Sequence, residues 1–244
     1  MPHWVTASTS DSPALRYAGA TASLRPVDPV PVPPACGLLP QARKVLAVIA
    51  RPGQESANLG ALLYAFRRAG ASLALLSVTR GEASPLNSTL ECLETRRPWE
   101  LQVAAALLGV SSVSVADYPD GGLDRRPLAE LTELVRREIR RQAPDLLLVV
   151  DPVADCLDDA VVARAVRCAA RLARVPVMAR AEPGTHGGQP VDLGADPAVA
   201  RAVQRSAAAA HASQSEARPE VERRLALLND RETIRWLVPA PRRA

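Results

Sequence analysis

Short runs of consecutive apolar residues alternate along the chain with longer segments in which apolar residues recur every three or four positions. The short runs are typical of strands buried on both faces, and the longer segments are typical of amphipathic helices. The pattern predicts strands at 44–50, 72–79, 112–116, 145–150, 175–179 and 190–193. It predicts helices at 55–69, 98–108, 127–143, 159–173, 197–211 and 217–236.

This order of elements predicts an α/β fold, with a Rossmann-like, doubly wound and mostly parallel sheet covered by helices on both faces. Residues 43–238 would form the domain and 239–244 a short tail. Residues 1–42 are rich in proline and lack apolar periodicity, so we expect them to form a disordered or extended N-terminal arm.

Ligands of parallel sheets bind beyond the carboxyl ends of the strands. The loops that start at Arg51, Thr79, Asp117 and Asp151 would all leave the sheet from that edge. We therefore expect any functional site to be built from these loops.

Composition narrows the function classes. Hydrophobic residues make up 48% of the chain and charged residues 23%, which is typical of a soluble globular protein. No apolar run approaches the roughly 18 residues of a membrane span, and no secretory signal pattern opens the sequence. The four cysteines are widely spaced, so reduced thiols in a cytoplasmic protein are expected.

The net charge of +4 is carried almost entirely by arginines that alternate with acids, as in Arg136-Arg137-Glu138. Such alternation is typical of solvated helix faces and does not predict nucleic-acid binding. No glycine-rich phosphate-binding loop follows the first strand, which argues against a nucleotide site. Nothing in the pattern predicts an oligomeric state.

Seven short motifs occur in order between residues 44 and 237. They are Val48-Ile49-Ala50-Arg51-Pro52-Gly53-Gln54-Glu55, Thr79-Arg80-Gly81-Glu82, Arg97-Pro98-Trp99-Glu100, Leu108-Gly109, Pro119-Asp120-Gly121-Gly122-Leu123, Pro144-Asp145 leading to Asp151-Pro152, and Ala210-His211-Ala212-Ser213-Gln214. Their order and spacing resemble the LmbE-like proteins, which include the PIG-L type N-acetylglucosaminyl deacetylases. The resemblance implies the same α/β fold and an amino-sugar or glycoconjugate ligand.

In that family zinc is held by a histidine and the second aspartate of the first motif, together with the final histidine of a later motif. The first aspartate activates the metal-bound water. The resemblance places these roles at Arg51, Gln54 and Asp159 for the metal and at Gly53 for the base. Cys156 stands where the family has a further histidine.

Arginine does not give up its proton to bind a cation, and glycine has no side chain to act as a base. We therefore predict a non-catalytic relative without a metal cofactor, in which Arg51 forms an ion pair with Asp159. The alternative is an active metal-dependent deacetylase that uses zinc in a rebuilt site around Asp155, Asp158 and Asp159.

The ligand-binding residues that we predict come from different loops at one edge of the sheet. They are Arg51, Gln54, Arg97, Asp120 and Asp159. In the family the residues matching Arg97 and Asp120 face the sugar.

Structural roles remain open for the same residues. Asp120 precedes two glycines and could serve a tight turn, Arg97 could pair with Glu100 on one helix, and Asp158 or Asp159 could cap the following helix. For His211 we favour a structural hydrogen bond.

Overall fold

The computed structural model describes residues 37–83, 92–152, 156–217 and 230–239. Their centre is a seven-stranded sheet with strand order β3-β2-β1-β4-β5-β7-β6. The strands are β1 (Lys44–Ile49), β2 (Ser72–Thr79), β3 (Ser112–Tyr118), β4 (Leu146–Val150), β5 (Val177–Ala181), β6 (Gln189–Asp192) and β7 (Arg231–Val238). The first five strands pair in parallel, and β7 pairs antiparallel with both β5 and β6.

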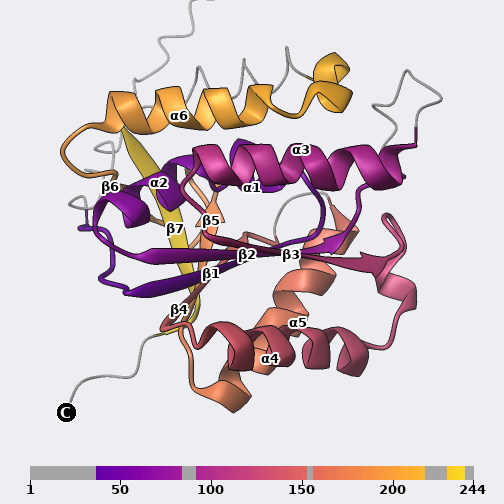
Figure 1. Ribbon diagram of the computed structural model, residues 1–244. Helices are drawn as coiled ribbons and strands as arrows, with labels where there is room; N and C mark the ends of the chain where they lie inside the picture. The colour runs from indigo at the N-terminus through magenta and orange to yellow at the C-terminus, as the bar shows by residue number, and fades with distance from the viewer. Residues whose placement is uncertain (1–36, 84–91, 153–155, 218–229, 240–244) are drawn as a thin grey trace, which may run out of the picture. The chain divides into compact units, whose positions relative to one another are not determined.

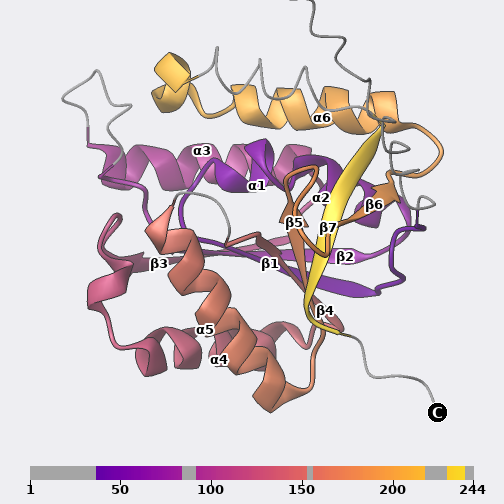
Figure 2. The same cartoon turned by 180° about the vertical axis from the view of Figure 1, so that it is seen from behind.

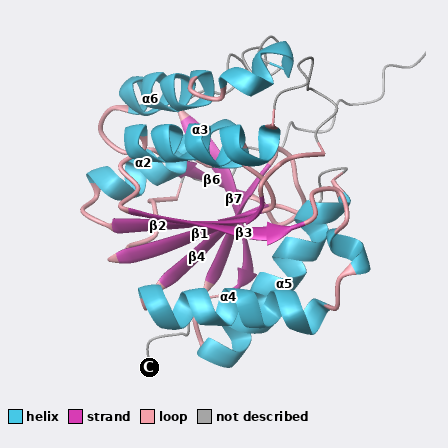
Figure 3. Ribbon diagram, turned by 45° about the vertical axis from the view of Figure 1, so that its right-hand side comes forward, coloured by secondary structure: helices cyan, strands magenta, loops and turns pink. Residues whose placement is uncertain are grey.

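The helices form one layer on each face of the sheet (Figure 1). They are α1 (Gln54–Ala57), α2 (Gly60–Arg68), α3 (Leu93–Leu107), α4 (Leu128–Gln142), α5 (Leu157–Ala173) and α6 (Pro197–Ala209). Helices α1, α2, α3 and α6 lie on one side and α4 and α5 on the other, which Figure 3 shows most directly.

The burial of β1 explains why its sequence is continuously apolar. Val45, Ala47 and Ile49 pack in the core beneath α2 and α3, while Leu46 and Val48 pack in the core above α4 and α5. Because both faces are covered, alternation of apolar and polar residues would leave polar groups in a core. The predicted α/β class and mostly parallel sheet are confirmed.

The chain runs outward from β1 to β2 and β3, and then returns to the other side of β1 to form β4. This reversal leaves the loops after β1 and β4 diverging at the carboxyl edge of the sheet, which is where such folds bind ligands. Figure 2 shows α5 in the foreground, leading away from this edge on the α4 side of the sheet.

The predicted helix at 217–236 is wrong in its final part. Residues 231–238 form strand β7, and 218–229 lie outside the described residues. The segment has a period of two, because Glu232 and Ile234 are buried while Thr233 and Arg235 are partly exposed. Because the buried position 232 is a glutamate, a prediction based on hydrophobicity does not detect this alternation.

Two helices differ in extent from their predictions. The helix expected at 55–69 is broken after Ala57, because the Gln204 amide donates to the carbonyls of Ser56 and Ala57 at 3.0 and 3.2 Å. Helix α3 begins at Leu93 and therefore contains Pro98, which the prediction placed at its start.

Gly37, which the prediction placed in the N-terminal arm, is hydrogen-bonded to the segment of β6. The Gly37 amide donates to the Pro190 carbonyl at 2.9 Å, and the Asp192 amide donates to the Gly37 carbonyl at 3.1 Å. Residues 1–36 of the predicted arm and 240–244 of the predicted tail lie outside the described residues.

Candidate functional site

A cluster of charged and polar side chains lies at the carboxyl edge of the sheet, where β1 and β4 diverge. Arg51 and Gln54 follow β1, Asp120 follows β3, Asp158 and Asp159 open α5 after β4, and Arg97 reaches in from α3. The structure thus brings together the five residues predicted to bind a ligand, and it adds Asp158 to them. We call these six residues the edge cluster.

Arg51 connects the two sides of the edge cluster, Asp120 after β3 and Asp158 at the start of α5. Its Nε lies 3.3 Å from Oδ1 of Asp120, and its Nη2 lies 3.3 Å from Oδ2 of Asp158. Nη2 also lies 3.1 Å from the Cys156 sulfur. The Arg51 side chain is 26% exposed, whereas the two carboxylates are 1% and 3% exposed. A partly exposed guanidinium therefore covers two buried carboxylates.

The predicted ion pair between Arg51 and Asp159 is wrong. Gln54 takes that place, because its Nε2 donates to Oδ1 of Asp159 at 2.7 Å. The other end of the amide accepts from the backbone N–H groups of Ala50 and Arg51 at 2.9 and 3.3 Å. Burial raises the pKa of Asp159, and the hydrogen bond from Gln54 only partly opposes this shift.

Asp158 holds the neighbouring turn and does not cap α5. Its Oδ2 accepts from the Gly121 amide at 2.8 Å and its Oδ1 from the Leu123 amide at 3.2 Å. The N-cap of α5 is Cys156, whose side chain makes no capping bond. Asp158 and Asp159 still lie in the first turn of α5, where the helix dipole favours negative charge.

Asp120 serves both the turn and the site. Its Oδ2 accepts from the Ala83 amide at 3.2 Å, its own amide donates to Glu82 at 2.9 Å, and the turn that follows places Gly121 at a φ of 73°. Burial raises the pKa of Asp120, and the attraction of Arg51 opposes the shift.

Arg97 is the most deeply buried residue of the edge cluster, with 1% of its surface exposed. Its Nη1 donates to the Gly81 carbonyl, whereas its Nε and Nη2 find no hydrogen-bond partner in the part of the chain that the structure describes. The alternative pairing with Glu100 does not form, because Glu100 accepts instead from Arg96 at 3.1 Å and from the Ser213 hydroxyl at 2.6 Å. Burial lowers the pKa of Arg97.

Gly53, which the resemblance places at the base position, has a left-handed backbone and lies against the end of the Gln214 side chain. Its φ is 103°, and a Cβ atom built there would lie 2.7 Å from Oε1 of Gln214. The Gln214 amide donates to the Pro52 carbonyl at 3.1 Å, which holds the side chain against the glycine. This conformation and this contact both favour glycine.

A buried ion pair between His211 and Glu55 supports the loop that follows β1. Nε2 of His211 lies 2.5 Å from Oε1 of Glu55, and both side chains are almost completely buried. Burial raises the pKa of Glu55, but pairing with His211 outweighs this effect and leaves the pKa below its usual value. Burial alone would lower the pKa of His211, but the adjacent Glu55 carboxylate outweighs burial and leaves the pKa of His211 above its usual value. The structural hydrogen bond expected for His211 is therefore present.

Sequence reasoning missed two other contacts. The Arg235 guanidinium binds both oxygens of Asp151 at 2.7 and 2.6 Å, which ties β7 to the end of β4. Asp158 was considered only as a cap or a metal ligand, because its partner Arg51 lies 107 residues away along the chain.

No group of three or more His, Cys, Asp or Glu side chains lies in a metal-binding arrangement among the residues that the structure describes. Asp155, which the rebuilt metal site would need, lies outside those residues. Within the same part of the chain no helix has the length and apolar character needed to span a membrane.

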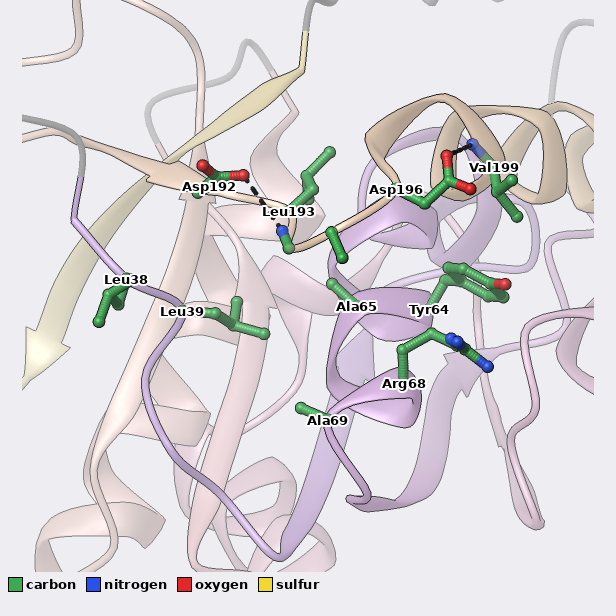
Figure 4. A pocket seen from close by; sticks show the side chains of 12 residues that line it. Leu38, Leu39, Tyr64, Ala65, Arg68, Ala69, Asp192, Leu193, Asp196 and Val199 are labelled. Atoms are coloured by element: carbon green, nitrogen blue, oxygen red, sulfur yellow. Dashed lines mark hydrogen bonds between the residues drawn. The ribbon is translucent and has the colours of Figure 1, made fainter.

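A separate pocket of about 680 Å³ lies away from the edge cluster (Figure 4). Leu38 and Leu39 form one wall, α2 contributes Tyr64 and Arg68, and the connection from β6 to α6 closes it. None of the six edge-cluster residues lines it.

Comparison with known proteins was made at three levels. A family model described as PIG-L, GlcNAc-PI de-N-acetylase, matches residues 46–170, just over half of the 244-residue chain. A 1D-myo-inositol 2-acetamido-2-deoxy-alpha-D-glucopyranoside deacetylase of Kineococcus radiotolerans is 36% identical over 89 residues. That match covers 34% of this chain and 25% of the relative, so the chain spans about a quarter of that protein's length.

Two solved structures share the fold at low sequence identity. The conserved protein TT1542 of Thermus thermophilus superposes with a TM-score of 0.66 at 20% identity, covering 82% of this chain and 97% of the other. The N,N'-diacetylchitobiose deacetylase of Pyrococcus horikoshii gives a TM-score of 0.63 at 17% identity, covering 81% and 85%. From the family match and the shared fold, we conclude that the chain belongs to the PIG-L family of de-N-acetylases.

Proposed function

We propose that this protein binds an amino-sugar conjugate at the edge cluster without a catalytic zinc ion and without hydrolysing the amide. The observation that carries the proposal is the position of Arg51, whose guanidinium contacts Asp120 and Asp158 at the place where the family has a metal ligand. The fixed positive charge of Arg51 balances these carboxylates as a metal ion would, and its guanidinium offers a metal ion no ligand atom.

The chemistry of the matching positions does not fit zinc. A catalytic zinc site needs about three protein ligands of nitrogen, sulfur or carboxylate type and an open position for water. Arg51 is always charged and repels a cation, and the amide nitrogen of Gln54 is a donor that already occupies Asp159. Asp159 alone remains as a possible ligand, and burial disfavours its charged form.

The base position gives independent support. A carboxylate at residue 53 would have to adopt a φ of 103° and displace Gln214. Either requirement is unfavourable for a residue with a Cβ atom. The proposal therefore rests on two separate features, one electrostatic and one steric.

The proposed ligand class follows from the retained polar groups. Asp120 is a buried acceptor carboxylate that the Arg51 guanidinium covers, and two guanidinium nitrogens of Arg97, Nε and Nη2, have no partner among the described residues. A buried charged donor without an acceptor is costly, so an oxygen atom delivered next to it is stabilised. Sugar hydroxyls supply such oxygens, and two of the relatives are named as deacetylases of amino-sugar conjugates.

The test combines metal analysis, ligand binding and turnover in the full-length protein. We expect substoichiometric zinc after dialysis against zinc and no amide hydrolysis of an N-acetylglucosamine conjugate. Calorimetry should detect binding of the conjugate, and Asp120→Asn should weaken it by about 1–3 kcal/mol, the usual cost of an unpaired buried group.

A grafted variant sharpens the test. Arg51→His with Gln54→Asp and Asp159→His restores the three ligand types and keeps Gly53, so that the steric problem is avoided. The matched control is Arg80→His, which replaces another arginine of the same edge whose ion pair with Asp117 is exposed. Zinc uptake by the graft alone supports the proposal, whereas stoichiometric zinc and turnover in the native protein contradict it.

The alternative function is a metal-dependent N-deacetylase with a rebuilt site. Its support is that Asp120 and Asp158 both contact the partly exposed Arg51, so a movement of Arg51 would free two carboxylates for a cation. Oxygen ligands of this kind suit harder cations than zinc. Hydrolysis that requires added magnesium or manganese and disappears in Asp159→Asn would favour this alternative.

A further inference from the structure

Helix α3 carries an apolar stripe on its outer face. Trp99, Val103 and Leu107 are 67%, 37% and 47% exposed. Their spacing of four residues places them on neighbouring turns of one helix face. In Figure 1 α3 is the foremost helix of its layer, above the edge of the sheet formed by β3.

The stripe is free of charge along its whole length. The other exposed positions between Trp99 and Leu107 are Gln102 and Ala106, while Glu100 is buried. Arg96 borders the stripe at its N-terminal end, where its charge is paired with Glu100.

The outer face of α4 differs, because Glu133 there forms ion pairs with both Arg136 and Arg140. The outer face of α4 thus carries charge, whereas the stripe on α3 does not. An exposed apolar patch of a few hundred square ångströms on a monomer is often functional, which makes this stripe a candidate contact surface.

We propose that α3 is the contact surface of a homodimer in which the helices of two copies cross antiparallel at Val103. The stripe is symmetric about this residue, since Trp99 and Leu107 lie four positions on either side of it. A two-fold axis through Val103 places Val103 against Val103, and the large Trp99 of one copy against the smaller Leu107 of the other. Such self-complementarity is what an isologous interface requires.

The exposed area agrees with a reversible dimer. The three exposed fractions correspond to about 300 Å² of apolar surface per copy, more than half of it from the tryptophan. A specific interface needs roughly 500 Å² per partner, so the three side chains supply more than half and their uncharged neighbours can supply the remainder. Interfaces at the small end of the range are mostly weak and transient, so we expect reversible association.

The lack of charge on the stripe favours a second copy of the chain over a membrane surface as its partner. Helices that lie on membranes carry lysine or arginine along their flanks to meet the headgroups. The single basic neighbour of the stripe within α3, Arg96, is already paired with Glu100. An uncharged face meets its own copy without like-charge repulsion, which favours the homodimer.

Sedimentation velocity of the full-length protein tests this contact, using native protein and the single variants Val103→Arg and Val103→Glu over a roughly hundredfold range of micromolar concentration. Native protein should shift from monomer to dimer, and each variant should associate at least about tenfold more weakly. Mixing the two variants in equal amounts should restore the dimer, because residue 103 would then face an opposite charge. The control is Leu172→Glu on α5, where a more exposed apolar residue, 68% accessible against 37% for Val103, lies outside the stripe.

Circular dichroism of each variant establishes that it is folded. A monomer at every concentration of native protein overturns the proposal, as does a dimer that survives both Val103 variants. A native monomer that binds phosphatidylserine vesicles through Trp99 would instead identify the stripe as a membrane contact. Recovery in the mixture of variants is expected only if two copies of residue 103 meet at the axis.

Discussion

Replacement of Arg51 by methionine removes the guanidinium over two buried carboxylates while keeping a side chain of similar length. Asp120 and Asp158 are 1% and 3% exposed at their side chains, so water can replace little of the lost interaction. Breaking a buried ion pair by removing one partner costs about 3–5 kcal/mol. Because 26% of the Arg51 side chain is exposed, screening reduces the effect, and we expect about 2–3 kcal/mol.

The penalty should depend on pH. Burial raises the pKa of Asp120 in the folded protein, although Arg51 opposes the shift. A carboxyl group with a raised folded pKa binds more protons in the folded state, so stability falls as pH rises from the unfolded value toward the folded value. Removing Arg51 raises the folded pKa further and extends this window upward. The loss of stability in Arg51→Met should therefore be larger at neutral pH than at about pH 5.

Thermal unfolding followed by circular dichroism measures the effect. A loss of about 2–3 kcal/mol corresponds to a fall of about 5–10 °C in Tm for a chain of this size. The matched control is Arg80→Met, because Arg80 and its partner Asp117 are 39% and 82% exposed and such a pair contributes at most about 1 kcal/mol. Equal losses in the two variants, or a loss in Arg51→Met that does not change with pH, would refute the reasoning.

Three further outcomes follow from buried contacts. His211→Ala leaves the Glu55 carboxylate buried without its partner and should lower the free energy of unfolding in urea by about 3–5 kcal/mol. Because the pKa of His211 is raised in the folded state, the stability of the native protein should decline as pH rises through that pKa. A stability profile that is flat from about pH 6 to 9 would contradict this. Gly53→Ala should cost about 1–2 kcal/mol through its positive φ and its contact with Gln214, and Gln214→Ala should restore only the part due to the contact. Glu232→Gln, which leaves two buried arginines without their shared carboxylate, should lower Tm by about 6–20 °C, while a change within error would show that the arginines find other partners.

Four strands of the parallel half, β1, β2, β4 and β5, could be predicted from sequence because each is buried on both faces and is largely apolar, whereas the edge strand β3 is only partly buried. Strand β2 has the predicted bounds of 72–79, and β4 differs by one residue at its start. Strand β7 was missed because its buried positions include Glu232, whose charge is neutralised by Arg180 and Arg201 from other elements. Local pattern carries no information on such distant partners.

The same limit applies to the edge cluster, where the positions of the residues could be predicted from sequence but their partners could not. The order of motifs was sufficient to place Arg51, Gln54, Arg97, Asp120 and Asp159 at one edge, since parallel strands bring their carboxyl ends together. It could not assign partners within the cluster. Arg51 pairs with Asp120 and Asp158, and Asp159 receives the Gln54 amide.

The sequence by itself determined the fold class and the edge of the sheet at which the polar residues gather, because both depend on residue identity and local periodicity. Only the tertiary structure decided which carboxylate each donor meets, that Gln214 closes the space beside Gly53, and that the apolar residues of α3 face outward. Pairing among four or five groups within a few ångströms is fixed by side-chain geometry and burial, and both arise only when segments more than 100 residues apart are packed together.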